Sequence, residues 1–466
     1  MSKPKNSSSF DYHFISLFLF LFLFVFLIIV KFSKFPLFEE IAHSENEKVK
    51  ERTEGINSQV KSKVLFLIAG GDIIFQKQLI EIANYRAKEK GLASAWKLFF
   101  HALEPIFQNY QKEGSKIVVA NLESPVATQR VEPKSYPPTF NGPPEALEGL
   151  KEAGFDILTI ANNHTLDQRR KGLSETIDAL QNAGLKYVGG GRKRDEAEKP
   201  LIIKDEVSEI RIAIFSFLFS PKSRTEPENM PAISIFREGA TGKLNEIKKR
   251  GEADVIVVFM HWIGEFIEKP MKKWKDAVEE LIGAGADAVI CHGPHVVGPA
   301  GWVEVNGRRG FVAYSLGNLL ANFGWEVYPS NFLKLFPDKN SAQRINARSE
   351  ALCVLRIERE KEKTGGAVLK EVILYPLWLE DNRYASLRKN GPPREIYPIW
   401  ISECMPPPEF GCPKNSMPQE CSARWEMIYS STKAVVEKLW NFKGWQIKKC
   451  PSLMPSESLS PLAFKF

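Results

Sequence analysis

From Lys63 onward the chain alternates short apolar runs with amphipathic stretches. Six apolar runs end abruptly in polar residues: VLFLIAGGD, IVVANLE, ILTIANNH, VIVVFMHW, AVICHGPH and FVAYSLGN. Short continuous apolar runs are typical of strands that are covered on both faces. The stretches GLSETIDALQNAGL and WKDAVEELIGAGA lie among these runs and have the apolar spacing of helices. The pattern therefore predicts an α/β fold.

The polar ends of these runs form a candidate site. In α/β sheets, ligands bind beyond the carboxyl ends of the strands, so we expect the six ends to meet in one cleft. Four of the seven histidines of the chain lie at these ends. The candidate side chains are Asp72, Asn121, Glu123, Asn163, His164, His261, His292, His295 and Asn318.

Carboxylate, amide and imidazole groups together suit one or two divalent metal ions with open positions for water or substrate. Each motif alone has an ordinary alternative. The sequence GGD also fits a turn before a helix N-cap, and HGPH also fits one ligand beside one structural histidine. The recurrence of such residues at six strand ends favours the metal site.

The N-terminus carries the longest apolar run. Phe14 to Val30 is apolar except for one serine and is close to the length of about 17 residues that a helix needs to span a bilayer. Because no small-x-small cleavage site follows it, a retained anchor is favoured over a cleaved signal peptide. We expect a single-pass cell-membrane protein whose main domain lies outside the cytoplasm, because the run is placed like an export signal.

Composition and charge narrow the class of protein. With 44% hydrophobic and 26% charged residues the chain is not disordered, and its length can bury a large core. A net charge of +7, with no arginine-rich block between aromatic residues, gives no reason to expect a nucleic-acid partner.

The cysteines bear on the compartment. Cys353 is predicted to lie in a buried strand and Cys291 in the site loop. In an oxidising compartment the remaining four can form two disulfides. A zinc site is disfavoured, because the sequence contains no CxxC pair. These four are Cys404, Cys412, Cys421 and Cys450.

The ordered motifs GD, NLE, NNHTLD, HWIGE, HGPH and SLGN resemble those of the CapA-like poly-gamma-glutamate capsule biosynthesis family, whose domain is similar to calcineurin-like metallophosphoesterases. The resemblance runs from about Val64 to about Asn318. It departs at Ile263 and Cys291, where glycine is common in relatives. The resemblance implies a four-layer α/β/β/α sandwich of metallophosphoesterase type, and the apolar run at 14–30 adds an N-terminal transmembrane helix.

This gives a domain plan and site roles. The plan is a cytoplasmic stub and anchor at 1–31, a charged stalk at 32–62, the CapA-like domain at 63–385 and a Pro/Cys-containing segment with a packed helix at 386–466. The resemblance implies metal ligands at Asp72, Asn121, Glu123, Asn163, His261, His292 and His295. Substrate contacts are expected at Glu265, Ser315 and Asn318.

The motif NNHTLD supplies the expected catalytic pair, in which His164 donates a proton to a leaving oxygen. Asp167 either orients this histidine or caps the following helix, and the cap is the favoured alternative. Asn162 is expected to hold the loop.

Two functions fit the resemblance. The first is a hydrolase or transferase of capsule polymer metabolism that uses one or two divalent ions (Mn, Zn, Fe or Mg). The second is a polymer-binding, export or tethering component without turnover. The expected partners are the membrane, an anionic polymer or phosphorylated envelope substrate, and other capsule-synthesis membrane proteins.

Overall fold

The computed structural model describes residues 64–132, 138–220, 226–237, 239–323, 346–360, 366–381 and 396–400. They belong to Ser62–Phe466, the second of two units into which the chain divides. Among these residues no helix is long and apolar enough to cross a membrane. The predicted span at 14–30, the stalk at 32–62, the four C-terminal cysteines and the predicted C-terminal helix lie outside the described residues.

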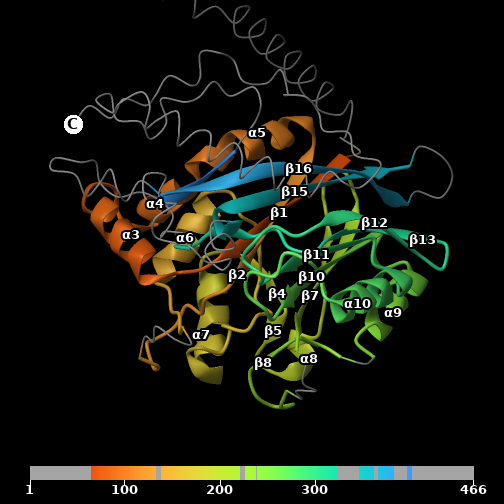
Figure 1. Cartoon of the computed structure of the whole chain (residues 1–466), viewed down its shortest axis with the longest axis horizontal. Helices are drawn as coiled ribbons and strands as arrows, with labels where there is room; N and C mark the ends of the chain where they lie inside the picture. The colour runs from red at the N-terminus through yellow and green to blue at the C-terminus, as the bar shows by residue number, and fades with distance from the viewer. Residues whose placement is uncertain are drawn as a thin grey trace, which may run out of the picture. The chain divides into compact units, whose positions relative to one another are not determined.

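The first of two mixed sheets contains β1, the first described strand, at its centre (Figure 1). In spatial order its strands are β17 (Ile396–Trp400), β16 (Ala367–Asp381), β15 (Ser349–Arg359), β1 (Val64–Ile73), β2 (Ser115–Leu122), β3 (Ile157–Thr159) and β4 (Lys186–Val188), and β14 (Asn318–Leu320) also pairs with β1. Strands β1 to β4 are parallel, whereas β15 to β17 are antiparallel to their neighbours. The sheet therefore continues to Trp400, beyond the boundary predicted at residue 385.

The second sheet has a parallel centre. Its strands are, in spatial order, β12 (Ala300–Val305), β13 (Arg308–Ala313), β11 (Ala288–His292), β10 (Val255–Trp262), β7 (Arg211–Phe219) and β6 (Leu201–Lys204), and β9 (Ile235–Phe236) also pairs with β7. Strands β7, β10, β11 and β13 run parallel, and the antiparallel strands β6 and β12 flank them. A separate pair consists of β5 (Gly190–Gly191) and β8 (Ala232–Ile233).

Helices cover the outer face of each sheet. The first sheet packs against α3 (Lys77–Lys90), α4 (Leu92–Lys97), η1 (Leu98–Leu103), α5 (Glu104–Glu113), α6 (Pro144–Glu152) and α7 (Arg169–Asn182). The second packs against α9 (Gly242–Arg250) and α10 (Lys272–Gly283). The short elements α8 (Arg194–Ala197) and η2 (Asn346–Arg348) complete the described set.

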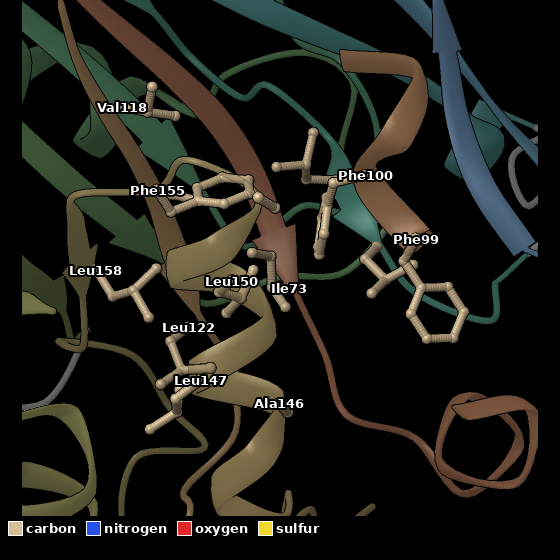
Figure 2. Close-up of a cluster of buried hydrophobic side chains, with 14 of the residues drawn as sticks. Ile73, Phe99, Phe100, Val118, Leu122, Ala146, Leu147, Leu150, Phe155 and Leu158 are labelled. Carbon is tan, nitrogen blue, oxygen red and sulfur yellow. The ribbon is translucent and has the colours of Figure 1, made fainter. Parts of the chain in front are cut away.

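Three hydrophobic cores separate the layers. Figure 2 shows part of the first, where Leu147 and Leu150 of α6 lie among strand side chains such as Leu122 and Leu158. The second core lies between the two sheets, and the third lies between the second sheet and α9 and α10. The order of helices, sheet, sheet and helices confirms the predicted α/β layering in the described residues.

The helices follow from their apolar spacing. In α10, the side chains of Trp274, Val278, Leu281 and Ile282 are buried at the spacing of one helix face. The predicted helices at 172–185 and 274–286 correspond to α7 and α10.

The two cysteines within the described residues are free and buried. Cys353 lies in β15, as predicted. The prediction that Cys291 lies in the site loop is wrong. Cys291 lies in β11, and its side chain is in the core on the helix side of the second sheet. Alternation along a strand sends neighbouring side chains to opposite faces, so Cys291 points away while His292 points between the sheets.

A glycine near the end of β1, Gly71, permits a close backbone approach. A Cβ atom added to Gly71 would lie 2.2 Å from the carbonyl oxygen of Gly317, just before β14. That carbonyl oxygen accepts a hydrogen bond from the amide of Asp72 at 3.1 Å. A side chain at position 71 would therefore push β1 and β14 apart next to Asp72, a residue of the candidate site.

We expect Gly71→Ala to lower the free energy of unfolding by about 1–3 kcal/mol, because the added methyl group meets backbone that cannot move aside cheaply. Gly242→Ala at the start of α9 is the matched control, since an added Cβ there has nothing within 4 Å. Urea denaturation of both variants measures the difference. Equal stability of the two variants would contradict the role assigned to Gly71.

Candidate metal site

The site lies where parallel strands of both sheets end. Asp72 on β1 is beside Asn121 on β2, and His261 on β10 is beside His292 on β11. Each pair is in register, so two sheets that face each other bring four side chains from distant parts of the sequence together. This is the convergence that the sequence predicts.

Asp72 is completely buried and accepts hydrogen bonds at both carboxylate oxygens. Asn121 Nδ2 donates to Oδ1 at 2.8 Å, and the amide of Gly293 donates to Oδ2 at 3.1 Å. His295 Nδ1 is 3.3 Å from the same Oδ2. Burial raises the pKa of Asp72, but the hydrogen bond from His295 and the nearby His292 and His261 rings outweigh burial and hold the pKa well below its usual range. Asp72 is therefore an ionised carboxylate.

Glu123 is also completely buried, but neither of its carboxylate oxygens has a hydrogen-bond partner among the described residues. Three imidazoles surround Oε1, with His261 Nε2 at 3.5 Å, His295 Nε2 at 3.9 Å and His164 Nε2 at 4.0 Å. Burial raises the pKa of Glu123 well above its ordinary value, and the charges of Asp72 and Glu265 add to the effect. A buried carboxyl without a donor is costly unless a cation compensates it.

His261 is held between two amides. Its Nε2 atom is 2.6 Å from Oδ1 of Asn163, and its Nδ1 atom is 3.3 Å from Nδ2 of Asn121. Burial lowers the pKa of His261 to about 3, so the ring is neutral at physiological pH. A neutral imidazole is the form that binds a metal.

Ligand-type atoms of Asp72, Glu123 and His261 lie within 4.8 Å of one another. Asn163 and His295 contact members of this group directly, through His261 and through Asp72. Oxygen and nitrogen donors of this kind suit a divalent cation, and the unpartnered oxygens of Glu123 point to the same conclusion. The residues that are present therefore fit one or two divalent ions.

The two histidines of HGPH have different surroundings. His292 Nε2 donates to the carbonyl oxygen of Gly70 at 3.0 Å, which leaves Nδ1 as the nitrogen with a lone pair. Nδ1 of His295 donates to Oδ1 of Asn318 at 3.0 Å, which leaves Nε2 directed toward Glu123. A hydrogen bond from the second ring nitrogen is how proteins orient metal-binding histidines.

His164 forms a pair with Asp167. Nδ1 of His164 is 2.8 Å from Oδ2 of Asp167, which also accepts a hydrogen bond from the amide of Phe140 at 2.7 Å. The favoured prediction that Asp167 caps the next helix is wrong, because Gln168 is the N-cap residue of α7 and no side chain caps it. The carboxylate turns toward the histidine instead and orients it.

Asn162 holds the loop, as expected. Its side-chain Nδ2 donates to the carbonyl oxygen of Leu122 at 2.8 Å, and its Oδ1 accepts from the amide of His164 at 3.1 Å and from Thr165 Oγ1 at 3.0 Å. These bonds join the loop after β3 to the end of β2. They place His164 on the Glu123 side of the site.

The three predicted substrate contacts differ in their exposure to solvent. Glu265 is exposed, and its charge acts on Glu123. Ser315 is buried, and its Oγ accepts from the amide of Gly317 at 3.2 Å. Asn318 is buried, and besides its bond to His295 it donates to the carbonyl oxygens of His295 and Ala347 at 3.2 and 3.1 Å. In this structure Ser315 and Asn318 support the site from within the protein.

Other contributors carried no sequence signal. Phe140 packs on the ring of His164 with centroids 4.5 Å apart, and Gln168 accepts from the amide of Arg130 at 2.7 Å. Glu350 in β15 is a second buried carboxyl without a hydrogen-bond partner among the described residues. Burial raises its pKa, an effect that Arg348 opposes and Asp72 reinforces. Nothing in the spacing of these residues distinguishes them from ordinary loop and strand residues.

We expect Glu123→Gln to be more stable than the natural chain when a chelator is present. Because the pKa of Glu123 is raised in the folded state, the natural chain loses stability as the pH rises above 4.5, the ordinary value, whereas glutamine does not titrate. The advantage of the variant should be small below pH 4.5 and reach about 1–3 kcal/mol at pH 8. Urea denaturation in EDTA across this range measures it.

Glu89→Gln on the exposed end of α3 is the matched control and should show no such advantage. Comparing each variant with the natural chain at the same pH removes the contribution of the buried histidines, which runs in the opposite direction. A pH-independent difference for Glu123→Gln would count against an uncompensated carboxyl.

Comparison with known proteins agrees with the motif order. The family model described as "Bacterial capsule synthesis protein PGA_cap" matches residues 66–323, which is more than half of the chain. The "Capsule biosynthesis protein CapA" of Bacillus anthracis is 28% identical over 294 residues, covering 61% of this chain and 62% of the relative. The "PGA biosynthesis protein CapA" of Bacillus subtilis (strain 168) is 30% identical over 263 residues, covering 55% and 63%.

The chain thus spans about three fifths of the length of these curated relatives. Among solved structures, a 5'-nucleotidase precursor from Thermus thermophilus is 13% identical with a TM-score of 0.34, covering 66% of this chain and 54% of the other. The match at 66–323 contains all the motifs that supply the site. On this match, the chain belongs to the bacterial capsule synthesis protein PGA_cap family.

Proposed function

We propose that the protein is a metal-dependent phosphoesterase of capsule or envelope polymer metabolism. The observation that carries this proposal is the buried carboxylate of Glu123, which lacks a hydrogen-bond partner among the described residues and faces three imidazoles. A purely structural site would satisfy this carboxylate with donors, as it satisfies Asp72. The names of the curated relatives support a role in poly-gamma-glutamate or a related polymer.

Asp72, Glu123 and His261 would hold the ion, and Asn163, His292 and His295 offer further donors. When bound, one or two divalent ions would supply Lewis-acid stabilisation of the charge that develops on a phosphoryl oxygen. The protein provides fixed donors in a water-poor setting, since Asp72 and Glu123 are completely buried.

The pair of His164 and Asp167 would provide the proton. In a hydrolysis, the oxygen of water bonds to phosphorus and gives up one proton to solvent. The bond from phosphorus to the leaving oxygen breaks, that oxygen takes a proton from Nε2 of His164, and His164 regains a proton from solvent. Asp167 is bonded to Nδ1, so it fixes the orientation of the ring. Phe140 packs against the ring and restricts its movement.

The place of action that we propose is the outer side of the cell membrane, with the apolar run at 14–30 as a single anchor. The support for this is the sequence alone. Extraction of membranes at high pH tests the anchor, and protease treatment of intact cells tests the side of the membrane. Release of the chain at high pH would contradict the anchor.

We expect the purified full chain to retain bound divalent metal, and Asp72→Ala to lose most of it, because the loss of a ligand leaves Glu123 and His261 as an incomplete set. Elemental analysis by mass spectrometry measures the metal. His101→Ala is the matched control, since His101 is exposed and lies on η1. Metal-free natural protein from metal-supplemented cells would oppose the proposal.

We expect His164→Ala to lower kcat on phosphoesters by about 100-fold to 10,000-fold while metal content is unchanged, since general acid catalysis contributes this much. Asp167→Asn should lower kcat by about 10-fold to 100-fold and alter the pH profile, because it orients His164. Steady-state kinetics on phosphomonoesters and phosphodiesters checks both. Tight binding of poly-glutamate without any turnover would favour the polymer-binding alternative.

A further inference from the structure

Four apolar side chains belong to the loops that carry the metal site, and we call them the apolar collar: Phe140, Ile263, Phe266 and Phe323. The ring of Phe140 packs on His164 at 4.5 Å between centroids, and the ring of Phe323 packs on His295 at 4.9 Å. Phe266 meets Phe323 edge to face at 6.2 Å. The collar thus begins directly on the side chains that surround Glu123.

Part of the collar is open to solvent. Ile263 is 41% exposed and is one of five large hydrophobic residues that are at least 41% exposed among the described residues. It stands two residues after His261. Phe266 and Phe323 are half-buried, whereas Phe140 is buried. An apolar group beside the metal site would therefore remove further apolar surface from water.

The backbone is arranged to present these side chains. Phe266 has a φ of 57°, an uncommon and costly value for a bulky residue, and its amide donates to the carbonyl oxygen of Pro294 at 2.8 Å. Phe140 is held by its bond to Asp167 and by the side chain of Gln168, which donates to its carbonyl oxygen at 3.3 Å. The collar is thus fixed by the same loops that carry the site residues.

The charge at this point disfavours an anionic chain. Glu265 is exposed between Ile263 and Phe266, and its charge reaches Glu123. A polycarboxylate that leaves the site past Ile263 would meet this like charge. An uncharged hydrocarbon would meet the apolar side chains instead.

We propose that the substrate is a phosphoester whose group nearest the phosphate is an apolar hydrocarbon, and that the apolar collar binds it. This rests on the proposed phosphoesterase function and specifies its substrate class. Burial of each methylene group raises the affinity about fourfold. The affinity should therefore increase with the length of the hydrocarbon chain for as long as the added methylene groups contact the collar.

The probes are ethyl-, butyl- and hexylphosphonate, which cannot be hydrolysed, with phosphonoacetate as the charged counterpart. Their dissociation constants are measured by calorimetry on the metal-loaded full chain in lipid nanodiscs. For the natural chain we expect a gain of about fourfold per methylene up to butyl, and phosphonoacetate should bind more weakly than ethylphosphonate.

Ile263→Ser should reduce the gain from ethyl to butyl at least threefold, and Phe323→Ala should reduce it further. Ile202→Ser is the matched control, because Ile202 is 42% exposed and lies on β6, an edge strand of the second sheet that carries none of the collar residues. It should leave the whole series unchanged. An equal loss in Ile263→Ser and Ile202→Ser, or a natural chain indifferent to chain length, would overturn the collar.

Measuring the turnover of ethyl and butyl phosphate distinguishes a failure of this inference from a failure of the proposed function. If the phosphonates show the chain-length gain but neither ester is hydrolysed, the collar stands and the phosphoesterase proposal fails. If both esters are hydrolysed at the same kcat/KM and the phosphonates bind equally, the phosphoesterase proposal stands and the collar fails.

Discussion

A carboxylate without a donor is the constraint on which this end of the molecule depends. Glu123 is buried at the end of β2, and the protein surrounds it with rings instead of donors. Three side chains beside it have hydrogen-bond partners: Asp72 bonds to Asn121 and Gly293, His295 to Asn318, and His164 to Asp167. The surrounding hydrogen bonds fix the position of each group, so the cost of Glu123 is left for a bound cation to offset.

That arrangement is possible because the site is divided between two sheets. His292 donates to Gly70 across the gap, and the amide of Gly293 reaches Asp72. A Cβ atom at Gly293 would lie 2.1 Å from the carbonyl oxygen of Trp262, and the residue has a φ of 101°, so glycine is required there. These contacts therefore join the ends of the two sheets at the site.

The fold and most of the site could be predicted because the buried strands are recognisable in the sequence as continuous apolar runs. The end of a run shows which polar residues leave the core, as for Asp72 and His261. The sequence could not show that Asp167 turns to His164. An aspartate just before a helix can cap that helix or bond to a nearby histidine, and its position in the sequence is the same in both cases. It could not show that Ser315 and Asn318 face inward, since their partners come from Gly317, His295 and Ala347 after folding.

The position of β1 has a consequence for how the chain folds. It is the first described strand, yet it pairs with β14 and β15, whose residues come about 250 to 290 positions later. A chain that emerges N-terminus first can pair β1 with β2 early, but the other edge of β1 stays open until residues near Ile357 arrive. During that interval an apolar strand with unpaired backbone groups is exposed to other chains. The late segment Ser349–Arg359 therefore covers the second side of β1, and truncation before it would leave an aggregation-prone edge.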